Sequence, residues 1–315
     1  MAMQLDLPSA LKASVESSEH KQLGKSGLRV SVPIFGTMSV GRSKWSEWVK
    51  DDEQALPLLK VAYVRGINSW DTAGLYSNGG AEEMIGKAIR KYDIPKHKLD
   101  VFIIPYWGDL TKSKDYVNQF GLSRQAIFDS VESSLKRIGT DYLDLLMVHR
   151  VDPTVPIEET VEALHDLVKS GKVRYIGASS MWTYQFAMMQ FCAERNDWTK
   201  FICMQNLYNL LYREEEGEMN KYCNETGVGI IPWAPLSSGY LTRPASDKDA
   251  TVRGRTDVLK RDLDVQEKRI SSPAHGFSSV KLMEEALAIR DQNLTEAEEQ
   301  YLEEPYQPRV IVGHS

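Results

Sequence analysis

The chain has 315 residues, 42% of them hydrophobic, and a formal net charge of −6. This composition is typical of a globular protein with a sizeable core, and the acidic balance argues against a nucleic-acid-binding protein. No run approaches the ~18 apolar residues of a membrane-spanning helix, and the amino-terminal residues lack the pattern of a secretory signal. The three cysteines have neither CxxC nor metal-ligand spacing, which favours a cytoplasmic protein with reduced thiols and no metal site.

From residue 30 onward, short apolar runs alternate with amphipathic stretches. Strands are expected over 32–39, 67–73, 99–104, 142–149, 173–179, 201–211 and 228–236, with 270–277 as a candidate eighth strand. Helices are expected over 51–66, 81–92, 123–138, 156–171, 184–195, 214–226 and 280–289. This alternation predicts parallel βαβ units, and about eight such units predict an α/β protein with a single (β/α)8 TIM barrel.

One segment interrupts the alternation. Residues 245–269 are mostly charged and show no amphipathic pattern, so an exposed loop or a poor helix is expected there and the seventh helix is incomplete or degenerate. A long loop at this position could also act as a lid over a ligand. Because no composition break divides the chain, we expect one barrel domain over 21–315, preceded by a polar extension over 1–20.

Polar side chains follow the predicted strands where a barrel holds its active site, at the carboxyl ends. Asp71 and Tyr76 follow the second strand, and His149 follows the fourth. The next three strands contribute Ser179, Ser180, Gln205, Ser237 and Gly239. Tyrosine can act as a general acid, and histidine can hydrogen-bond a carbonyl oxygen. These residues therefore predict a proton-transferring site.

Five motifs in this order resemble the successive signatures of the aldo-keto reductases. They are GINSWDTAGLYSNGGAEEMIGKAI, DYLDLLMVHR, GKVRYIGASS, MQNLYNLLYRE and IIPWAPLSSGYL. The branch is similar to fungal members near the potassium-channel β-subunit and aflatoxin-aldehyde reductase groups, and the resemblance covers most of residues 20–315. It implies reduction of aldehydes or ketones by NADPH without a metal.

The resemblance also implies roles for individual residues. Tyr76 matches the proton donor, Asp71 its supporting carboxylate, and His149 the residue that orients the carbonyl group. Ser179, Ser180 and Gln205 match the group that holds the nicotinamide carboxamide. The other residues expected to bind the cofactor are Gly36 and Thr37, the pyrophosphate-loop residues Leu236, Ser237, Gly239, Leu241 and Arg243, and Ser278, Ser279 and Glu285 in the adenosine-binding stretch.

Two departures from the family pattern bear on activity. The family's catalytic lysine after the third strand is replaced by Pro105-Tyr106, and the next lysines are Lys112 and Lys114. Without a positive charge beside it, the Tyr76 phenol is expected to keep a pKa near the usual value of about 10 and to be a poorer acid. The second departure is Leu282, near the place where relatives carry a basic residue for the 2′-phosphate.

Two functions therefore stay open at this point, beside a third interpretation in which the chain is a degraded paralogue whose barrel is marginally stable because helix seven is lost. One is an NADPH-dependent reductase of small carbonyl compounds with impaired turnover, and the other is a regulatory protein that binds the cofactor with little catalysis. A cation close to Tyr76 would favour the enzyme. We expect no nucleic-acid or membrane partner, and the sequence leaves the substrate and the oligomeric state open.

Overall fold

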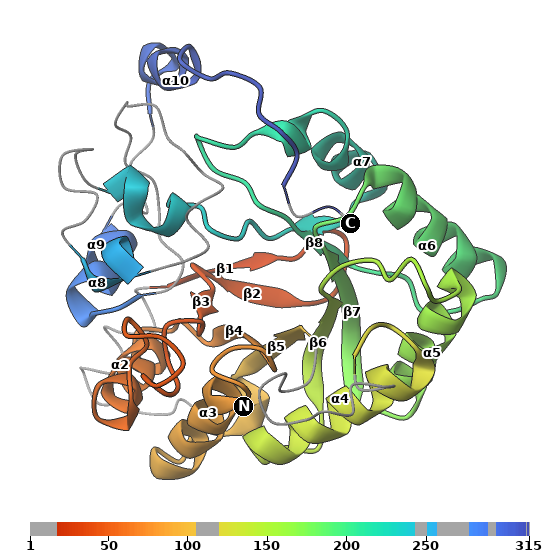
Figure 1. Cartoon of the computed structure of the whole chain (residues 1–315), viewed down its shortest axis with the longest axis horizontal. Helices are drawn as coiled ribbons and strands as arrows, with labels where there is room; N and C mark the ends of the chain where they lie inside the picture. Colours follow the sequence, from red (N-terminus) through yellow and green to blue (C-terminus); the bar gives the residue numbers. More distant parts are fainter. Residues whose placement is uncertain are drawn as a thin grey trace, which may run out of the picture.

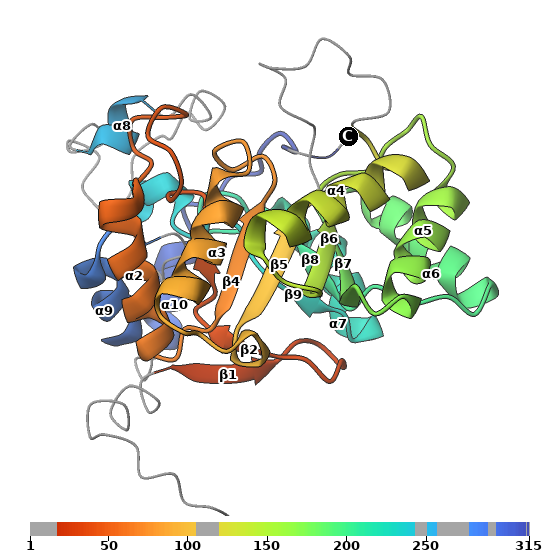
Figure 2. The ribbon, with the colours of Figure 1, turned by 90° about the horizontal axis from the view of Figure 1, so that it is seen from below.

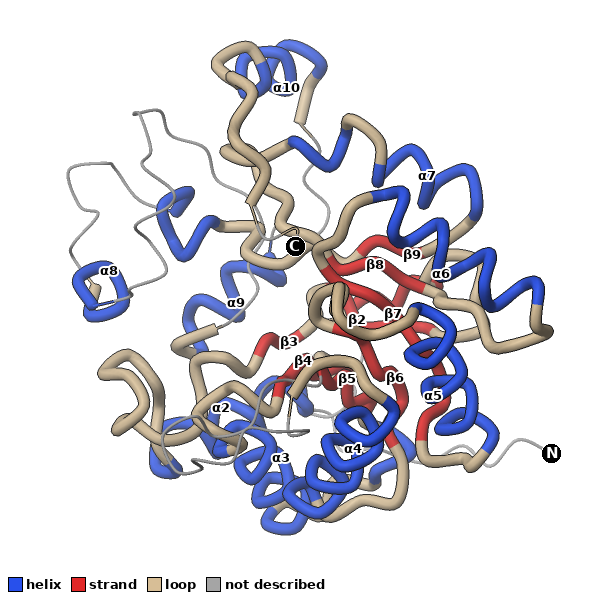
Figure 3. The backbone as a smooth tube through the Cα atoms, turned by 45° about the vertical axis from the view of Figure 1, so that its right-hand side comes forward, coloured by secondary structure: helices blue, strands red, loops and turns tan. Residues whose placement is uncertain are grey.

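The computed structural model describes residues 18–104, 120–242, 251–256, 277–288, 294–312 and 314. Strands lie at the centre and helices surround them (Figure 1). Seven strands form one parallel sheet in sequence order: β3 (Phe35–Gly36), β4 (Ser69–Ala73), β5 (Asp100–Ile104), β6 (Leu143–Val148), β7 (Val173–Ser179), β8 (Cys203–Gln205) and β9 (Gly229–Ile230). The sheet curves round, with helices on its outer side (Figure 3).

The helices follow the strands in alternation. They are α2 (Asp52–Val64), α3 (Gly80–Lys91), α4 (Arg124–Ile138), α5 (Ile157–Lys169), α6 (Thr183–Arg195), α7 (Met219–Thr226), α8 (Val252–Thr256), α9 (Val280–Ala288) and α10 (Glu296–Glu303). Three 3₁₀ helices are η1 (Lys96–Lys98), η2 (Glu214–Glu216) and η3 (Ser237–Thr242). The predicted βα alternation is thus confirmed from β3 to β9.

Helix α4 shows how local sequence sets these elements. Ser123 precedes the helix, and its side chain accepts a hydrogen bond from the Ala126 backbone N–H. Gly139 ends the helix with a left-handed backbone, φ 78°. Serine at the amino-terminal cap and glycine at the carboxyl end are the residues that these two positions favour, so both predicted boundaries are confirmed.

The buried side chains form two clusters. The larger cluster lies between the sheet and the helices and includes Phe35, Trp70, Ile85, Leu146 and Phe186. The smaller cluster contains strand residues that point to the opposite face of the sheet, together with amino-terminal residues. Among its members are Leu23, Val30, Leu145, Met147 and Cys203. Because successive residues of a strand point to opposite faces, the sheet buries one face under the helices and the other inside the curve.

An antiparallel hairpin crosses one end of the sheet (Figure 2). It consists of β1 (Glu19–Gln22) and β2 (Arg29–Val32). The Ser31 N–H donates to Ser69 Oγ at 3.0 Å at the start of β4, and the Lys25 N–H donates to the Gly227 carbonyl at 2.8 Å before β9. The hairpin therefore covers the end at which the strands begin, opposite to their carboxyl ends.

The first predicted strand is wrong in extent. The run over 32–39 is divided, because β2 ends at Val32 and β3 covers only Phe35–Gly36. Pro33 lies between the two strands, and proline has no N–H to donate to a sheet. Most of the run is buried as expected, although Val32 is exposed, and it serves two different sheets.

The expected strand over 228–236 is also shorter, since only Gly229–Ile230 pairs as β9. Pro232 and Pro235 interrupt the run that follows. One isolated contact continues it, a parallel bridge between Leu207 and Trp233. The strand therefore ends at Ile230, and the irregular segment that follows it carries site residues.

The charged segment over 245–269 is described only for residues 251–256, and these contain the five-residue helix α8. Arg253 lies 4.4 Å from the centre of the Trp48 ring, and Gly254 is buried. Of the candidate eighth strand over 270–277, only Phe277 is described; it is buried, 5.8 Å from the Phe35 ring. Helix α10 was not predicted, although Thr295 and Glu298 form a capping box at its start.

All three cysteines are free and buried. None of the helices in the described parts of the chain has the length and apolar character required to cross a bilayer.

Candidate functional site

Asp71 lies on β4, where it is buried and contacts residues of β3 and β8. Gly36 on β3 pairs with it across the sheet, and the Thr37 N–H donates to its carbonyl oxygen at 2.8 Å. The Gln205 side-chain amide at the end of β8 donates to Asp71 Oδ1 at 3.2 Å. Burial raises the pKa of Asp71 to about 7, and the hydrogen bond from Gln205 opposes that shift.

Tyr76 lies in the turn after β4, where its N–H donates to the Ala73 carbonyl at 2.9 Å. Burial and the charge of Asp71 raise the pKa of the phenol far above its ordinary value, while Arg253 and Arg150 act to lower that pKa. The expectation that this pKa stays near about 10 is therefore wrong. Desolvation of Tyr76 raises this pKa by more than the two arginines lower it.

His149 and Arg150 follow β6 directly. Burial, and next the charge of Arg150, lower the pKa of His149 to about 3, so its ring is neutral at pH 7. The Arg150 guanidinium donates to the backbone carbonyl of His149. A neutral histidine can donate one ring N–H to a carbonyl oxygen.

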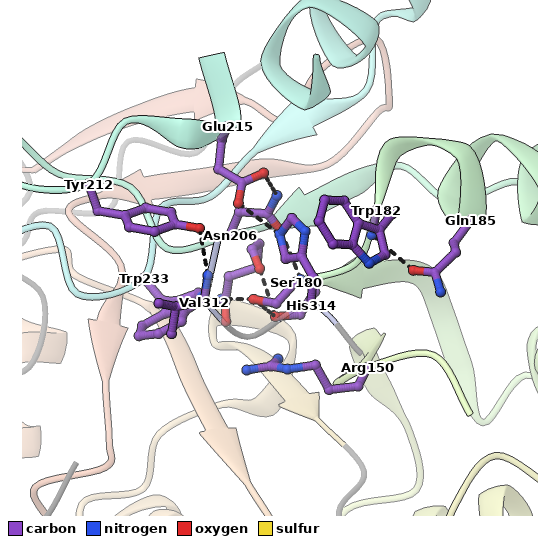
Figure 4. Close-up of polar contacts among 12 residues, drawn as sticks. Arg150, Ser180, Trp182, Gln185, Asn206, Tyr212, Glu215, Trp233, Val312 and His314 are labelled. Atoms are coloured by element: carbon purple, nitrogen blue, oxygen red, sulfur yellow. Dashed lines mark hydrogen bonds and ion pairs between the residues drawn. The ribbon is translucent and has the colours of Figure 1, made fainter. Parts of the chain in front are cut away.

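Two consecutive serines end β7 and lie beside the end of β8. Ser179 Oγ donates to the Gln205 carbonyl at 2.7 Å, and the Ser180 N–H donates to Asn206 Oδ1 at 2.7 Å. The Trp233 indole N–H donates to Ser180 Oγ at 3.0 Å (Figure 4). Trp233 was not among the candidate residues; Asn206 follows Gln205 at a strand end and was expected at this face, but not as a cofactor ligand.

The loop after β9 is a tight turn with left-handed backbone. Ser237, Ser238 and Gly239 have φ values of 46°, 54° and 93°. The Ser237 and Gly239 N–H groups donate to the Ala234 and Leu236 carbonyls, at 2.8 Å each. The Leu241 N–H donates back to the Leu236 carbonyl at 3.3 Å and closes the loop.

Two buried hydroxyls at this face have no hydrogen-bond partner among the described residues. They are Thr37 Oγ1 and Ser237 Oγ; Thr37 is 0% exposed and Ser237 is 1% exposed. Buried polar groups are ordinarily paired, so unpaired ones mark a place for a ligand. Both belong to the predicted cofactor site, and hydroxyls and backbone N–H groups are suitable partners for a phosphorylated dinucleotide.

The remaining predicted residues lie farther out. Ser278 and Ser279 are exposed, and Ser279 Oγ accepts from the Leu282 N–H at 3.3 Å at the start of α9. Glu285 is exposed and pairs with Lys281 at 3.7 Å. Arg243, Lys112 and Lys114 lie outside the described residues, as does the Pro105-Tyr106 pair.

A buried hydrogen-bonded pair, Glu215 and His314, adjoins the two serines and was missed by sequence reasoning. Glu215 Oε2 accepts from the Asn206 amide at 2.5 Å, and Glu215 Oε1 accepts from His314 Nε2 at 2.9 Å. The His314 ring meets Trp182 edge-on, with 4.9 Å between ring centres (Figure 4). The acidic run that contains Glu215 looks in sequence like an ordinary helix start, and nothing local connects it to His314.

Comparison with known proteins agrees with this geometry. The aldo/keto reductase family model matches residues 34–290. An aldo-keto reductase of Fusarium vanettenii is 48% identical over 99% of this chain and 98% of its own length, and one of Alternaria alternata is 46% identical over 98% of each. The versiconal hemiacetal acetate reductase of Aspergillus parasiticus is 40% identical over 93% of this chain and 98% of its own.

The alignment with the Fusarium vanettenii protein spans 361 positions, more than the 315 residues of this chain, so that relative has segments with no counterpart here. The family model spans the parallel sheet from β3 to β9. The chain belongs to the aldo/keto reductase family, an oxidoreductase family with the (β/α)8-barrel fold.

Proposed function

We propose that this protein is an NADPH-dependent reductase of small aldehydes or ketones that works in the cytoplasm and turns over slowly. The observation that carries the proposal is the group of three desolvated residues, Asp71 on β4, Tyr76 after β4 and His149 after β6. Strongly shifted pKa values in a cluster of this kind are typical of active sites.

The cofactor would be held by residues of this chain at the carboxyl ends of the strands. Ser179, Ser180 and Gln205 would hold the nicotinamide end. Thr37 Oγ1, Ser237 Oγ and the loop through Gly239 would hold the phosphates, as the two unpaired hydroxyls favour. When bound, NADPH supplies the hydride that reduces the carbonyl carbon.

The chain's own residues would handle the proton. The neutral His149 ring donates a hydrogen bond to the carbonyl oxygen and fixes its position. The Tyr76 phenol then gives its proton to that oxygen, which completes the alcohol and leaves a phenolate. Asp71, with a pKa of about 7, lies close enough to act on Tyr76 electrostatically.

Slow turnover follows from the acidity of the donor. A phenol with a pKa far above its usual value is a weaker acid, and general acid catalysis typically contributes about 10²–10⁴-fold to the rate. Among the described residues, Arg150 and Arg253 are the positive charges that lower this pKa. They partly take the place of the family's lysine.

The first test is NADPH titration by quenching of protein fluorescence, followed by NADPH oxidation at 340 nm with 4-nitrobenzaldehyde. We expect saturable binding and slow turnover. Tyr76→Phe should bind NADPH as the unmodified protein does and lose about 100-fold or more in kcat/KM, because the proton donor is gone. Tyr63→Phe, which removes a hydroxyl on α2, is the matched control and should be unchanged.

Each outcome is informative. Turnover that Tyr76→Phe abolishes supports the proposal. Tight NADPH binding without turnover of any carbonyl compound contradicts it and favours the regulatory function. Absence of NADPH binding would contradict both functions.

A further inference from the structure

Residues 304–312 fold back along η2, and His314 lies in the site. The backbone N–H of Arg309 donates to Glu214 Oε1 at 2.6 Å, and the N–H of Val312 donates to the Tyr212 hydroxyl at 3.0 Å. These contacts carry the segment to the carboxyl-end face of the sheet, opposite the β1–β2 hairpin (Figure 2). His314 lies at this face, and only 7% of its side chain is exposed.

Three hydrogen bonds connect His314 to a predicted cofactor ligand. His314 Nε2 donates to Glu215, Glu215 accepts from the Asn206 amide, and Asn206 Oδ1 accepts from the Ser180 N–H at 2.7 Å. Figure 4 shows these side chains gathered in one cluster, with the Arg150 side chain extending toward it from the other side. Glu215 is itself 3% exposed, so the whole chain of bonds is buried.

The other ring nitrogen of His314 is unused. Nδ1 is buried and has no hydrogen-bond partner among the described residues. Since a carboxylate only accepts, Nε2 must carry the proton that it donates to Glu215. In a ring that carries this one proton, Nδ1 is a lone-pair acceptor, and a buried acceptor without a donor is costly. A ligand with an N–H or O–H group would satisfy it.

We propose that His314 belongs to the nicotinamide subsite, where its Nδ1 accepts a hydrogen bond from the carboxamide NH₂ group. Glu215 and Asn206 are positioning residues that hold the ring and Ser180 in one arrangement. The inference rests on the proposed function, because it requires a nicotinamide cofactor. It adds an acceptor from residues 304–314 to the serines and glutamine that the strands supply.

The geometry favours the carboxamide as the donor. Ser180 Oγ already accepts from Trp233, and Ser179 Oγ already donates to a backbone carbonyl. Gln205 directs its amide N–H to Asp71. The carboxamide NH₂ group needs acceptors, and His314 Nδ1 is one that the surrounding protein leaves open.

The test measures dissociation constants by isothermal titration for three probes. They are NADP⁺, its 3-acetylpyridine analogue, which has a methyl group in place of the carboxamide NH₂, and 2′,5′-ADP, which lacks the nicotinamide ring. His314→Ala should weaken NADP⁺ binding by about tenfold, the equivalent of one hydrogen bond. It should leave binding of the analogue and of 2′,5′-ADP within about twofold of the unmodified protein.

His165→Ala is the matched control. His165 is also a partly buried histidine with a hydrogen bond, to Thr199 at 3.0 Å, and a tryptophan neighbour, Trp198, but it lies on α5. It should affect none of the three constants.

The outcomes separate the two proposals. Equal weakening of all three probes by His314→Ala would mean a general structural role and would overturn the inference. Unchanged or tighter NADP⁺ binding would overturn it too, while the reductase proposal would stand. If the unmodified protein bound neither NADP⁺ nor 2′,5′-ADP, both proposals would be wrong.

Discussion

At the scale of single residues, burial shifts the pKa values of three side chains in the direction that favours the neutral form. The pKa of Asp71 rises, that of Tyr76 rises, and that of His149 falls to about 3. In each case desolvation is the largest cause, because a charged form loses more by leaving water than a neutral one. Keeping these groups neutral therefore lowers the free energy of unfolding at pH values where the same groups are charged in the unfolded chain.

Asp71 gives a stability test of this statement. Its pKa is about 7 in the folded protein against an ordinary value of 3.8. Between about pH 4 and pH 7 the folded protein keeps a proton that the unfolded chain has lost, so stability falls as the pH rises through this window. Asp71→Asn should therefore gain stability relative to the unmodified protein from pH 4 to pH 8, by up to about 4 kcal/mol.

The measurement is urea unfolding of both proteins at pH 4, 6 and 8. Asp129→Asn, at an exposed position of α4, is the control and should show no such trend. A stability difference between Asp71→Asn and the unmodified protein that does not change with pH would contradict a raised pKa.

The residues found from sequence and those missed differ in how their contacts arise. His149 and Gln205 were found because each follows or ends an apolar strand, and Asp71 because it is the charged residue within one, which are purely local patterns. Glu215 and His314 were missed because their contact joins positions 99 apart in the chain. Such a pairing depends on the path of the whole segment after α10, which no local spacing encodes.

At the scale of elements, the ends of helices are where sequence is most informative. Ser123 caps α4, so Ser123→Ala should lower the free energy of unfolding by about 1 kcal/mol, since the Ala126 N–H loses its acceptor. Chemical denaturation measures this. Ser133→Ala makes the same change at an exposed position within α4 and should be neutral or slightly stabilising. Equal effects would contradict the capping role.

Elements that depend on partners were predicted less well. The expected helix over 214–226 divides into η2 and α7 around Gly217, and the carboxylates of η2 bind the 304–314 segment. Acidic residues are common at helix starts, so sequence alone indicated the commoner arrangement. Similarly, the strand expected over 228–236 pairs for only two residues because prolines follow.

At the scale of the whole molecule, the hairpin and β9 meet too closely for any side chain at Gly24. Its φ is +56°, and an added Cβ would lie 2.4 Å from Gly227 O and from Gly229 N. Gly24→Ala should therefore force the hairpin away from the sheet. The buried Cys203, which packs with the hairpin residues Leu23 and Val30, should then react faster with a thiol reagent such as DTNB.

Cys192 on α6 is the internal control for this labelling. It lies in the other buried cluster, away from the hairpin, and its rate should not change. Equal acceleration of both thiols would indicate global destabilisation instead of local opening. Mass spectrometry of the labelled peptides distinguishes the two sites.

The order of the strands has a consequence for how the chain folds. Neighbours in the parallel sheet are also neighbours in sequence, so each strand can join its predecessor by closing one βα crossover. The bond from Lys25 to Gly227 is different, because it brings together distant parts of the chain and requires β9 to be in place. We therefore expect the hairpin to close this end of the sheet late in folding, and a partly synthesised chain without β9 to leave the interior around Cys203 open to water.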